Sequence, residues 1–308
     1  MRITVFGSGG VGGYFGARLA QAGCDVGFVA RGPHLHALTT QGLRIESPLG
    51  DVALPAVRAS DAAADLGTPD VVLVCVKLWD LDAAVRAITP VVAPRTAVIS
   101  FQNGVQKDDV LRRAFGAPAV VGGVVYISAG IVGPGVVRHT GKLQKLVIGE
   151  YDGSRSARVE ALLDAFVRGG VDASISADIR RTLWEKFVFL VGMSAATASM
   201  RSTIGPIRAN ARSRAFLLDV MREVVAVGRA HGVPLPADFA DDRLAFCDGL
   251  PPEMEASMYT DLKHGRRLEV AYLSGAVVEL GNTVGVPTPL NRAVSDVLAL
   301  HANGAPPA

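Results

Sequence analysis

The sequence predicts an α/β fold: a doubly wound, parallel sheet in the N-terminal half, followed by a separate all-helical domain. Segments typical of strands and of helices alternate up to about residue 174. The run at 70–76 is continuously apolar after its aspartate, as in a parallel strand covered on both faces. Beyond residue 175 the strand-like pattern disappears. We therefore expect two domains, at 1–174 and 175–308, with no repeat and no low-complexity linker.

Turn residues divide the first half into its elements. A short apolar strand runs into glycines, and the helix after it is stopped by Gly23. Pro48 and Gly50 form a turn between two short strands. The expected strands are 2–6, 24–30, 43–47, 52–57, 70–76, 97–101, 120–128, 136–140 and 146–150, and the expected helices are 14–23, 35–41 and 80–88.

The second half is expected to contain helices only. They are placed at 175–200, 208–231, 236–247, 254–263, 269–284 and 288–301, with a frayed tail from Ala302. A substrate would then lie in a cleft between the two domains, beside the carboxyl ends of the strands.

The first strand leads into a glycine-rich turn that consists of Gly7, Ser8, Gly9, Gly10, Val11 and Gly12. Three of its glycines fit G-x-G-x-x-G, which lays a dinucleotide pyrophosphate against a helix N-terminus. Gly7 permits the tight turn, Gly9 lets backbone N–H groups approach the phosphates, and Gly12 lets the helix pack closely on the strand. The alternative is a glycine-rich turn without a ligand. Because a strand precedes the motif and a helix follows it, the sequence favours a Rossmann-type nucleotide-binding domain.

The end of the second strand bears on the choice of cofactor. An acid normally stands there to bind the ribose 2′-OH of NAD, but this chain has Arg31. A guanidinium pairs with a 2′-phosphate, whereas a carboxylate would repel it. Asp25 lies at the wrong end of the strand to replace the missing acid. The sequence therefore favours NADP(H) over NAD(H); the alternative for Arg31 is a solvated loop cation.

Composition excludes several function classes. The net charge of +2 and pI near 8.5 are too mild to indicate nucleic-acid binding. Cys24, Cys75 and Cys247 are widely scattered, so neither a metal site nor a disulfide framework is expected. The uncharged stretch 114–137 is broken by prolines and glycines, which argues against a membrane span. We expect a cytoplasmic protein without a signal peptide, and a homodimer stays an open alternative.

Polar residues stand where chemistry would be expected. Lys77 and Asn103 each follow a buried strand, at the end where a parallel sheet presents groups to a ligand. Lys186 opens a largely apolar helix, so it either snorkels to the surface or is a buried cation directed at a substrate carbonyl. Glu269 is a plausible partner for Lys186. Ser257 precedes Asp261 by four positions, so the two share a helix face.

Taken together, these motifs resemble the ketopantoate reductase (2-dehydropantoate 2-reductase) family over nearly the whole chain. The shared motifs are 7–12, 75–77, 102–104, 133–135 leading to 139–141, 184–186, and Ser257 with Asp261 and Glu269. The resemblance implies an NADP-binding Rossmann domain joined to a helical domain like that of 6-phosphogluconate dehydrogenase. It also implies reduction of a 2-oxo acid. In such an enzyme Lys186 would be the general acid that protonates the carbonyl oxygen, and Glu269 would orient it.

The same resemblance implies the binding residues. Asn103 would contact both nicotinamide and substrate, and Ser257 would bind the substrate. Lys77 would line the cofactor side of the cleft, and Arg31 would bind the 2′-phosphate. Lys186 itself would also contact the substrate.

One departure from the family concerns the substrate. Asparagines commonly follow the catalytic lysine one and two turns on, where this chain has Leu190 and Ser194. Losing an amide hydrogen bond costs about 1–3 kcal/mol. Ser194 is still expected to bind substrate, but with weaker hydrogen bonding than an asparagine would provide.

The leading hypothesis is NADPH-dependent reduction of ketopantoate to (R)-pantoate on the route to pantothenate and coenzyme A. The alternatives are a reductase of a different, less polar 2-oxo acid, and a non-catalytic NADP-binding regulatory protein.

Overall fold

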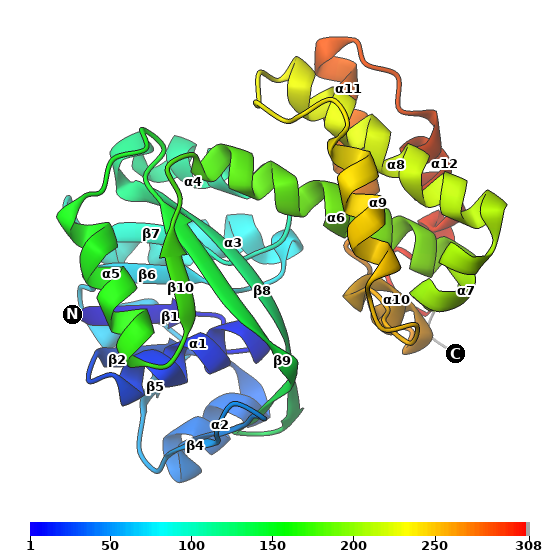
Figure 1. Cartoon of the computed structure of the whole chain (residues 1–308). Helices are drawn as coiled ribbons and strands as arrows, with labels where there is room; N and C mark the ends of the chain where they lie inside the picture. Colours follow the sequence, from blue (N-terminus) through cyan, green and yellow to red (C-terminus); the bar gives the residue numbers. More distant parts are fainter. Residues whose placement is uncertain (306–308) are drawn as a thin grey trace. The chain divides into compact units, whose positions relative to one another are not determined.

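The computed structural model describes residues 1–305, which divide into two compact units (Figure 1). The first unit is Met1–Thr182 and the second begins at Leu183. The dividing point falls inside helix α6 (Ile179–Met200), so the chain passes from one unit to the other without leaving the helix.

A run of parallel strands forms the centre of the first unit. The strands β1 (Arg2–Phe6), β2 (Asp25–Val29), β6 (Val71–Val74) and β7 (Ala97–Ser100) lie in the order β7-β6-β1-β2, and all three pairs are parallel. Their inner residues are buried, which agrees with their nearly continuous apolar sequences. A short strand that the sequence did not predict, β5 (Arg58–Ser60), extends this run beside β2.

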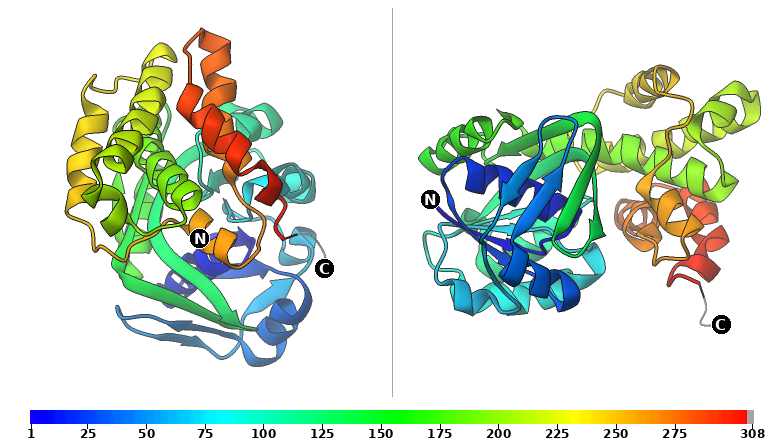
Figure 2. Two further views of the ribbon diagram at one scale, coloured as in Figure 1. Left: turned by 90° about the vertical axis from the view of Figure 1, so that its right-hand side faces the viewer. Right: turned by 90° about the horizontal axis from the view of Figure 1, so that it is seen from below.

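A long antiparallel hairpin makes the sheet mixed rather than purely parallel. Figure 2 shows its two long strands, β8 (Val120–Gly133) and β9 (Val136–Gly149), which pair with each other. The strands predicted at 136–140 and 146–150 are thus parts of one strand. Its pairing with β8 shifts register around Gly141, whose φ of +76° suits glycine.

Three further strands complete the sheet on the β9 side. β3 (Leu43–Glu46) and β10 (Asp172–Ile175) run parallel to β9, and β4 (Val52–Leu54) is antiparallel to β3. The helix predicted from residue 175 is therefore wrong at its start, because residues 172–175 pair with β9 and the helix begins at Ile179.

Helices cover both faces of this sheet. α1 (Gly10–Gln21) and α5 (Ala157–Arg168) lie on one face, and α3 (Leu81–Ile88) and α4 (Lys107–Phe115) lie on the other (Figure 1). α2 (Gly32–Gln41) follows β2. α4 and α5 are absent from the predicted elements. On the buried side of α1, the Phe15 ring packs edge-to-face on Phe101 and Phe166, at centroid distances of 5.5 and 6.1 Å.

The second unit is helical, as predicted. Besides α6 it contains α7 (Ile204–Ala209), α8 (Ala211–Ala230), α9 (Phe239–Asp248), α10 (Ser257–Lys263), α11 (Ser274–Val284) and α12 (Pro289–Val297). α8 contacts α7, α9, α11 and α12. α6 crosses α8 closely, since a Cβ on Gly192 would lie 2.4 Å from the Met221 side chain.

The helix boundary at residue 210 and the C-terminal tail differ from expectation for local reasons. The helix predicted at 208–231 is divided at Asn210, whose side chain accepts the N–H groups of Arg212 and Ser213 and so begins α8. The tail from Ala302 does not fray up to residue 305, because the backbone of Ala302 bonds Leu268 and that of Ala305 bonds Gly265. The rest of the predicted tail, 306–308, lies outside the described residues.

Over residues 1–305, no helix combines the length and the apolar character that crossing a bilayer requires.

Candidate functional site

The predicted cofactor residues of the first unit follow four adjacent parallel strands. Gly7 follows β1, Arg31 lies two residues after β2, Lys77 three residues after β6, and Asn103 three residues after β7. Because parallel strands end at the same edge of a sheet, the four positions share one edge. This is the edge at which open α/β sheets bind ligands.

The glycines of the turn have different reasons to be glycine. Gly7 has a φ of +100°, which disfavours other residues. A Cβ on Gly10 would lie 2.1 Å from the carbonyl oxygen of Ala129 in β8, and one on Gly12 would lie 2.2 Å from that of Gly7. Around Gly9, in contrast, a Cβ would meet nothing within 4 Å. Packing therefore does not require a glycine at position 9, and the open space in front of it fits the close approach of a ligand.

The N-terminus of α1 is suited to an anion. Gly9 is its N-cap and provides no capping side chain, and Gly10, Val11 and Gly12 make up the first turn. The N–H groups of a first turn have no acceptor within their own helix. They also lie at the positive end of the helix dipole. A dinucleotide pyrophosphate would be held by this turn, in the space beside Gly9.

Ser8 contributes to the shape of the turn. Its backbone N–H and its hydroxyl both donate to the carbonyl oxygen of Val29, at 3.1 and 3.0 Å, and the N–H of Gly7 donates to the same oxygen at 3.2 Å. The polar groups of Ser8 thus bind the end of β2, and the donors available to a phosphate would come from residues 9–12.

His34, which the sequence reasoning did not single out, connects the turn to the β8–β9 hairpin. Its Nδ1 accepts the N–H of Gly135 at 3.1 Å, so its Nε2 carries the proton and donates to the carbonyl oxygen of Ser8 at 2.9 Å. Burial lowers the pKa of His34, against an opposing contribution from the Ser8 bond. The neutral ring therefore joins the glycine-rich turn to the hairpin.

The other predicted residues of this edge occupy loops. Arg31 is exposed at the N-cap of α2. The ammonium of Lys77 lies over the Trp79 ring, 5.6 Å from its centroid. Asn103 is half-buried in the loop between β7 and α4.

The predicted catalytic pair lies in the second unit. Lys186 is half-buried on the second turn of α6, next to the buried Phe187. Glu269 is 3% exposed and precedes a 3₁₀ turn at Val270–Tyr272. Both side chains have interaction partners within the molecule.

The predicted substrate residues of the second unit differ in exposure. Ser194 is 1% exposed, and its hydroxyl has no hydrogen-bond partner among residues 1–305. Nearby on the helix, Thr197 and Ser199 donate to carbonyl oxygens one turn back, as serines and threonines in helices commonly do. Leu190, one turn before Ser194, is half-buried, and Ser257 is exposed at the start of α10. The Ser194 hydroxyl is thus a buried polar group without a partner in the described part of the chain.

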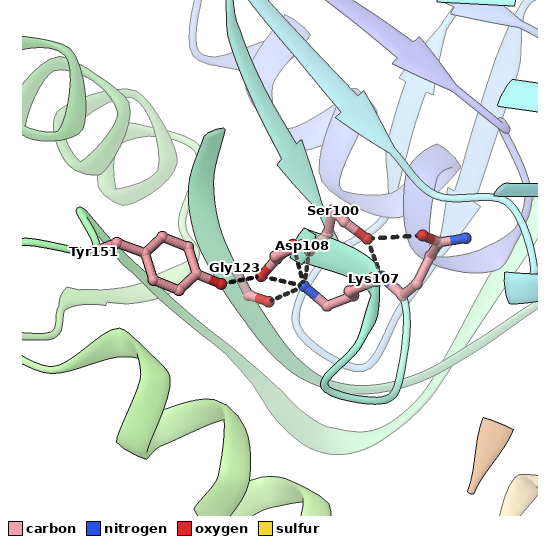
Figure 3. Close-up of polar contacts among 6 residues, drawn as sticks. Ser100, Lys107, Asp108, Gly123 and Tyr151 are labelled. Atoms are coloured by element: carbon pink, nitrogen blue, oxygen red, sulfur yellow. Dashed lines mark hydrogen bonds and ion pairs between the residues drawn. The ribbon is translucent and has the colours of Figure 1, made fainter. Parts of the chain in front are cut away.

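Buried polar groups near Asn103 were also missed. Lys107 and Asp108 are 0% and 1% exposed, and their side chains form an ion pair of 2.9 Å. The hydroxyl of Tyr151 donates to Asp108 at 2.6 Å (Figure 3). Burial, and then the charge of Asp108, raise the pKa of the Tyr151 phenol, which stays a donor. The charged run Lys107–Asp109 is typical of a solvated helix start, so the sequence carried no signal for this network.

Comparison with known proteins identifies the family. Residues 3–153 match the family model "Ketopantoate reductase PanE/ApbA", and residues 178–302 match its C-terminal counterpart. A protein of Mesorhizobium japonicum named 2-dehydropantoate 2-reductase is 35% identical, over 96% of this chain and 95% of its own. A protein of Halobacterium salinarum with the same name is 31% identical, over 97% of this chain and 98% of its own.

Solved structures agree with this assignment. The PanE/ApbA family ketopantoate reductase of Ralstonia eutropha has a TM-score of 0.89 and 34% identity, and the alignment covers 98% of each chain. A D-mandelate dehydrogenase, solved with NADH and anilino(oxo)acetate, has a TM-score of 0.88 at 20% identity and thus shares the fold. The chain belongs to the ketopantoate reductase family, whose members are oxidoreductases that act on CH–OH groups.

Proposed function

We propose that this protein reduces a 2-oxo acid to the 2-hydroxy acid with NADPH, and that 2-dehydropantoate, reduced to (R)-pantoate, is its leading substrate. The reaction would serve pantothenate and coenzyme A synthesis. The observation that supports a dinucleotide cofactor is the open space at Gly9, in front of an uncapped helix N-terminus. The substrate is taken from the relatives, which are named 2-dehydropantoate 2-reductase.

NADP(H) is favoured over NAD(H) by the end of β2. Arg31 is exposed there, as the N-cap of α2. A guanidinium forms paired, charge-assisted hydrogen bonds with a phosphate. The 2′-phosphate of NADPH would bind Arg31, while the pyrophosphate lies at the first turn of α1.

The chain's own residues would handle the proton and the substrate. When bound, reduced nicotinamide supplies the hydride to the oxo carbon. Lys186 would donate a proton to the carbonyl oxygen, and its positive charge would stabilise the alkoxide as it develops. Glu269 would orient the amine, and solvent would restore its proton after product release. Asn103 would contact nicotinamide and substrate, Lys77 would line the cofactor side, and Ser257 and Ser194 would bind the acid.

A different 2-oxo acid is the second candidate, and Leu190 favours it. This side chain is half-buried one turn after Lys186, at a place where an amide would bind a polar substrate tail. An apolar side chain there accepts a less polar tail at no loss of hydrogen bonding.

A panel of 2-oxo acids tests the proposal. The purified protein is mixed with NADPH and each acid, and the nicotinamide absorbance is followed. We expect the highest kcat/KM with 2-dehydropantoate. Another acid preferred by about a hundredfold would identify the second candidate instead. Tight NADPH binding without turnover of any acid would contradict the enzyme assignment and favour a regulatory NADP-binding protein.

A further inference from the structure

One buried ammonium group connects the two ends of the loop that contains Asn103. The Nζ of Lys107, the first residue of α4, donates to the carbonyl oxygen of Ser100, the last residue of β7, at 3.0 Å. This bond connects the two ends of the loop 101–106. The same ammonium donates to both carboxylate oxygens of Asp108, at 2.9 and 3.0 Å, and to the carbonyl oxygen of Gly123 in β8, at 3.4 Å. Figure 3 shows these contacts converging on Lys107.

Three further hydrogen bonds hold this arrangement. The hydroxyl of Tyr151, just after β9, donates to Asp108 at 2.6 Å. At the start of the loop, the Ser100 hydroxyl donates to the side-chain oxygen of Gln102 at 2.9 Å and accepts the N–H of Gln102 at 3.2 Å. The residue immediately before Asn103 is therefore held by both its backbone and its side chain.

Stability alone gives a poor reason for this network. A helix N-terminus disfavours a cation, yet Lys107 stands at the first position of α4. A buried ion pair is also often no more stabilising than apolar residues of the same size. In addition, the side-chain nitrogen of Gln102 is buried without a partner in the described part of the chain, which costs free energy. The molecule keeps one particular loop geometry in spite of these costs.

We propose that Lys107, Asp108 and Tyr151 are positioning residues that hold the loop 101–106 in the geometry in which Asn103 meets the nicotinamide and the substrate. The inference rests on the proposed function, because it takes the role of Asn103 from there. The three residues, called the loop clamp below, act through the loop. They leave phosphate binding to the turn at residues 7–12.

The test replaces the ion pair by apolar residues in K107M/D108L and removes one hydroxyl in the milder variant Y151F. We expect K107M/D108L to fold and kcat to fall about tenfold to a hundredfold, the effect of displacing a catalytic group by about an ångström. The Kd of NADPH should stay within about threefold, because the phosphate contacts are intact. Y151F should show a smaller fall in the same direction. The matched control D109N/R113Q removes one charge of each sign from the exposed face of α4 and should leave kcat unchanged.

Coupling to Asn103 separates positioning from general destabilisation. If the clamp acts through Asn103, adding K107M/D108L to Asn103→Ala should lower kcat little further. Hydrogen exchange of the loop 101–106 should be faster in K107M/D108L than in the parent protein, with the rest of the sheet unchanged. Additive losses in kcat, or unchanged exchange in the loop, would overturn the inference.

The two proposals fail differently. A parent protein that reduces no 2-oxo acid refutes the proposed function. The exchange experiment, which needs no turnover, still decides whether the clamp orders the loop. A parent protein that is active, with K107M/D108L equally active, refutes the clamp alone.

Discussion

The backbone of Ala129 passes so close to Gly10 that a Cβ on this glycine would lie 2.1 Å from the Ala129 carbonyl oxygen. Strand β8 thus lies directly against the first turn of α1. Gly9, one residue earlier, has open space on the corresponding side. Packing therefore requires a glycine at position 10, whereas it places no such requirement on position 9.

Alanine at these two positions should separate stability from binding. Gly9→Ala should lower the free energy of unfolding by no more than about 1 kcal/mol, as expected for a changed N-cap. It should weaken NADPH binding about tenfold or more, because the methyl group enters the space proposed for the pyrophosphate. Gly10→Ala should destabilise the fold by about 1–3 kcal/mol more. Urea unfolding and NADPH fluorescence titration measure the two effects; equal destabilisation by both variants would contradict this account.

Arg31→Ala should change cofactor selectivity. Loss of a hydrogen-bonded charge pair with the 2′-phosphate costs about 1.5–3 kcal/mol, so the Kd of NADPH should rise about tenfold to a hundredfold. The Kd of NADH, which lacks that phosphate, should hardly change. Arg31→Lys keeps the charge and should recover part of the affinity. Parallel losses for the two cofactors would argue against 2′-phosphate binding at Arg31.

Lys186→Ala should abolish most turnover and preserve cofactor binding. General acid catalysis contributes about a hundredfold to ten-thousandfold, so kcat should fall by that factor while the Kd of NADPH stays unchanged. Arg181→Ala, an exposed substitution on the same helix, is the control. Steady-state kinetics and equilibrium titration give the two quantities. Full activity in Lys186→Ala would disprove the assigned role.

His34 should make stability depend on pH. Its pKa is lowered in the folded state, so the unfolded chain binds more protons between the two pKa values and stability rises with pH across that interval. The contribution of His34 is complete above the unfolded value of about 6.5 and is lost as the pH falls through the folded value. Protonation adds a hydrogen to Nδ1, which can then no longer accept the Gly135 N–H.

The variant His34→Gln isolates this effect, because an amide does not titrate. Urea unfolding at several pH values should give a stability difference between parent and variant that shrinks as the pH falls below 6.5. A difference that is constant with pH would show that the ring stays neutral throughout or has no part in stability.

Leu190→Asn should shift substrate preference. An added amide next to the proposed substrate tail recovers about 1 kcal/mol of hydrogen bonding, so kcat/KM for 2-dehydropantoate should rise about fivefold to tenfold. Leu190→Met keeps an apolar side chain of similar volume and should not produce this gain. The same substrate panel gives the measurement. No gain with Leu190→Asn would mean that the side chain at 190 does not face the substrate.

Much of the fold follows from the sequence because the central strands are buried on both faces. Apolar runs located β1, β2, β6 and β7 to within a residue or two, and the glycine pattern located the turn after β1. The hairpin was harder to predict. The polar residues around Gly141 interrupt the apolar pattern, although the backbone pairing of β9 continues on both sides of them. Helix α4, which begins with charged residues, gave no apolar periodicity strong enough to be recognised.

The sequence predicted residues of the candidate site only where a suitable residue type follows the end of a strand. Gly9, Arg31 and Asn103 stand two or three residues after the ends of strands, so their positions at the sheet edge could be predicted. His34 accepts the N–H of Gly135, which lies 101 positions further along the chain. Tyr151 donates to Asp108, which lies 43 positions earlier. No local pattern encodes such contacts, because they depend on where the fold places the turn of the hairpin and the residues after β9.

The enclosure of Lys107 has a chemical consequence. An amine that is 0% exposed is out of reach of aqueous electrophiles, such as acylating metabolites, as long as the first unit stays folded. Exposed lysines of the same chain have no such protection. The reactivity of this one amine therefore rises only when the surrounding β7, β8 and α4 come apart, so its chemical labelling records transient opening of that part of the sheet.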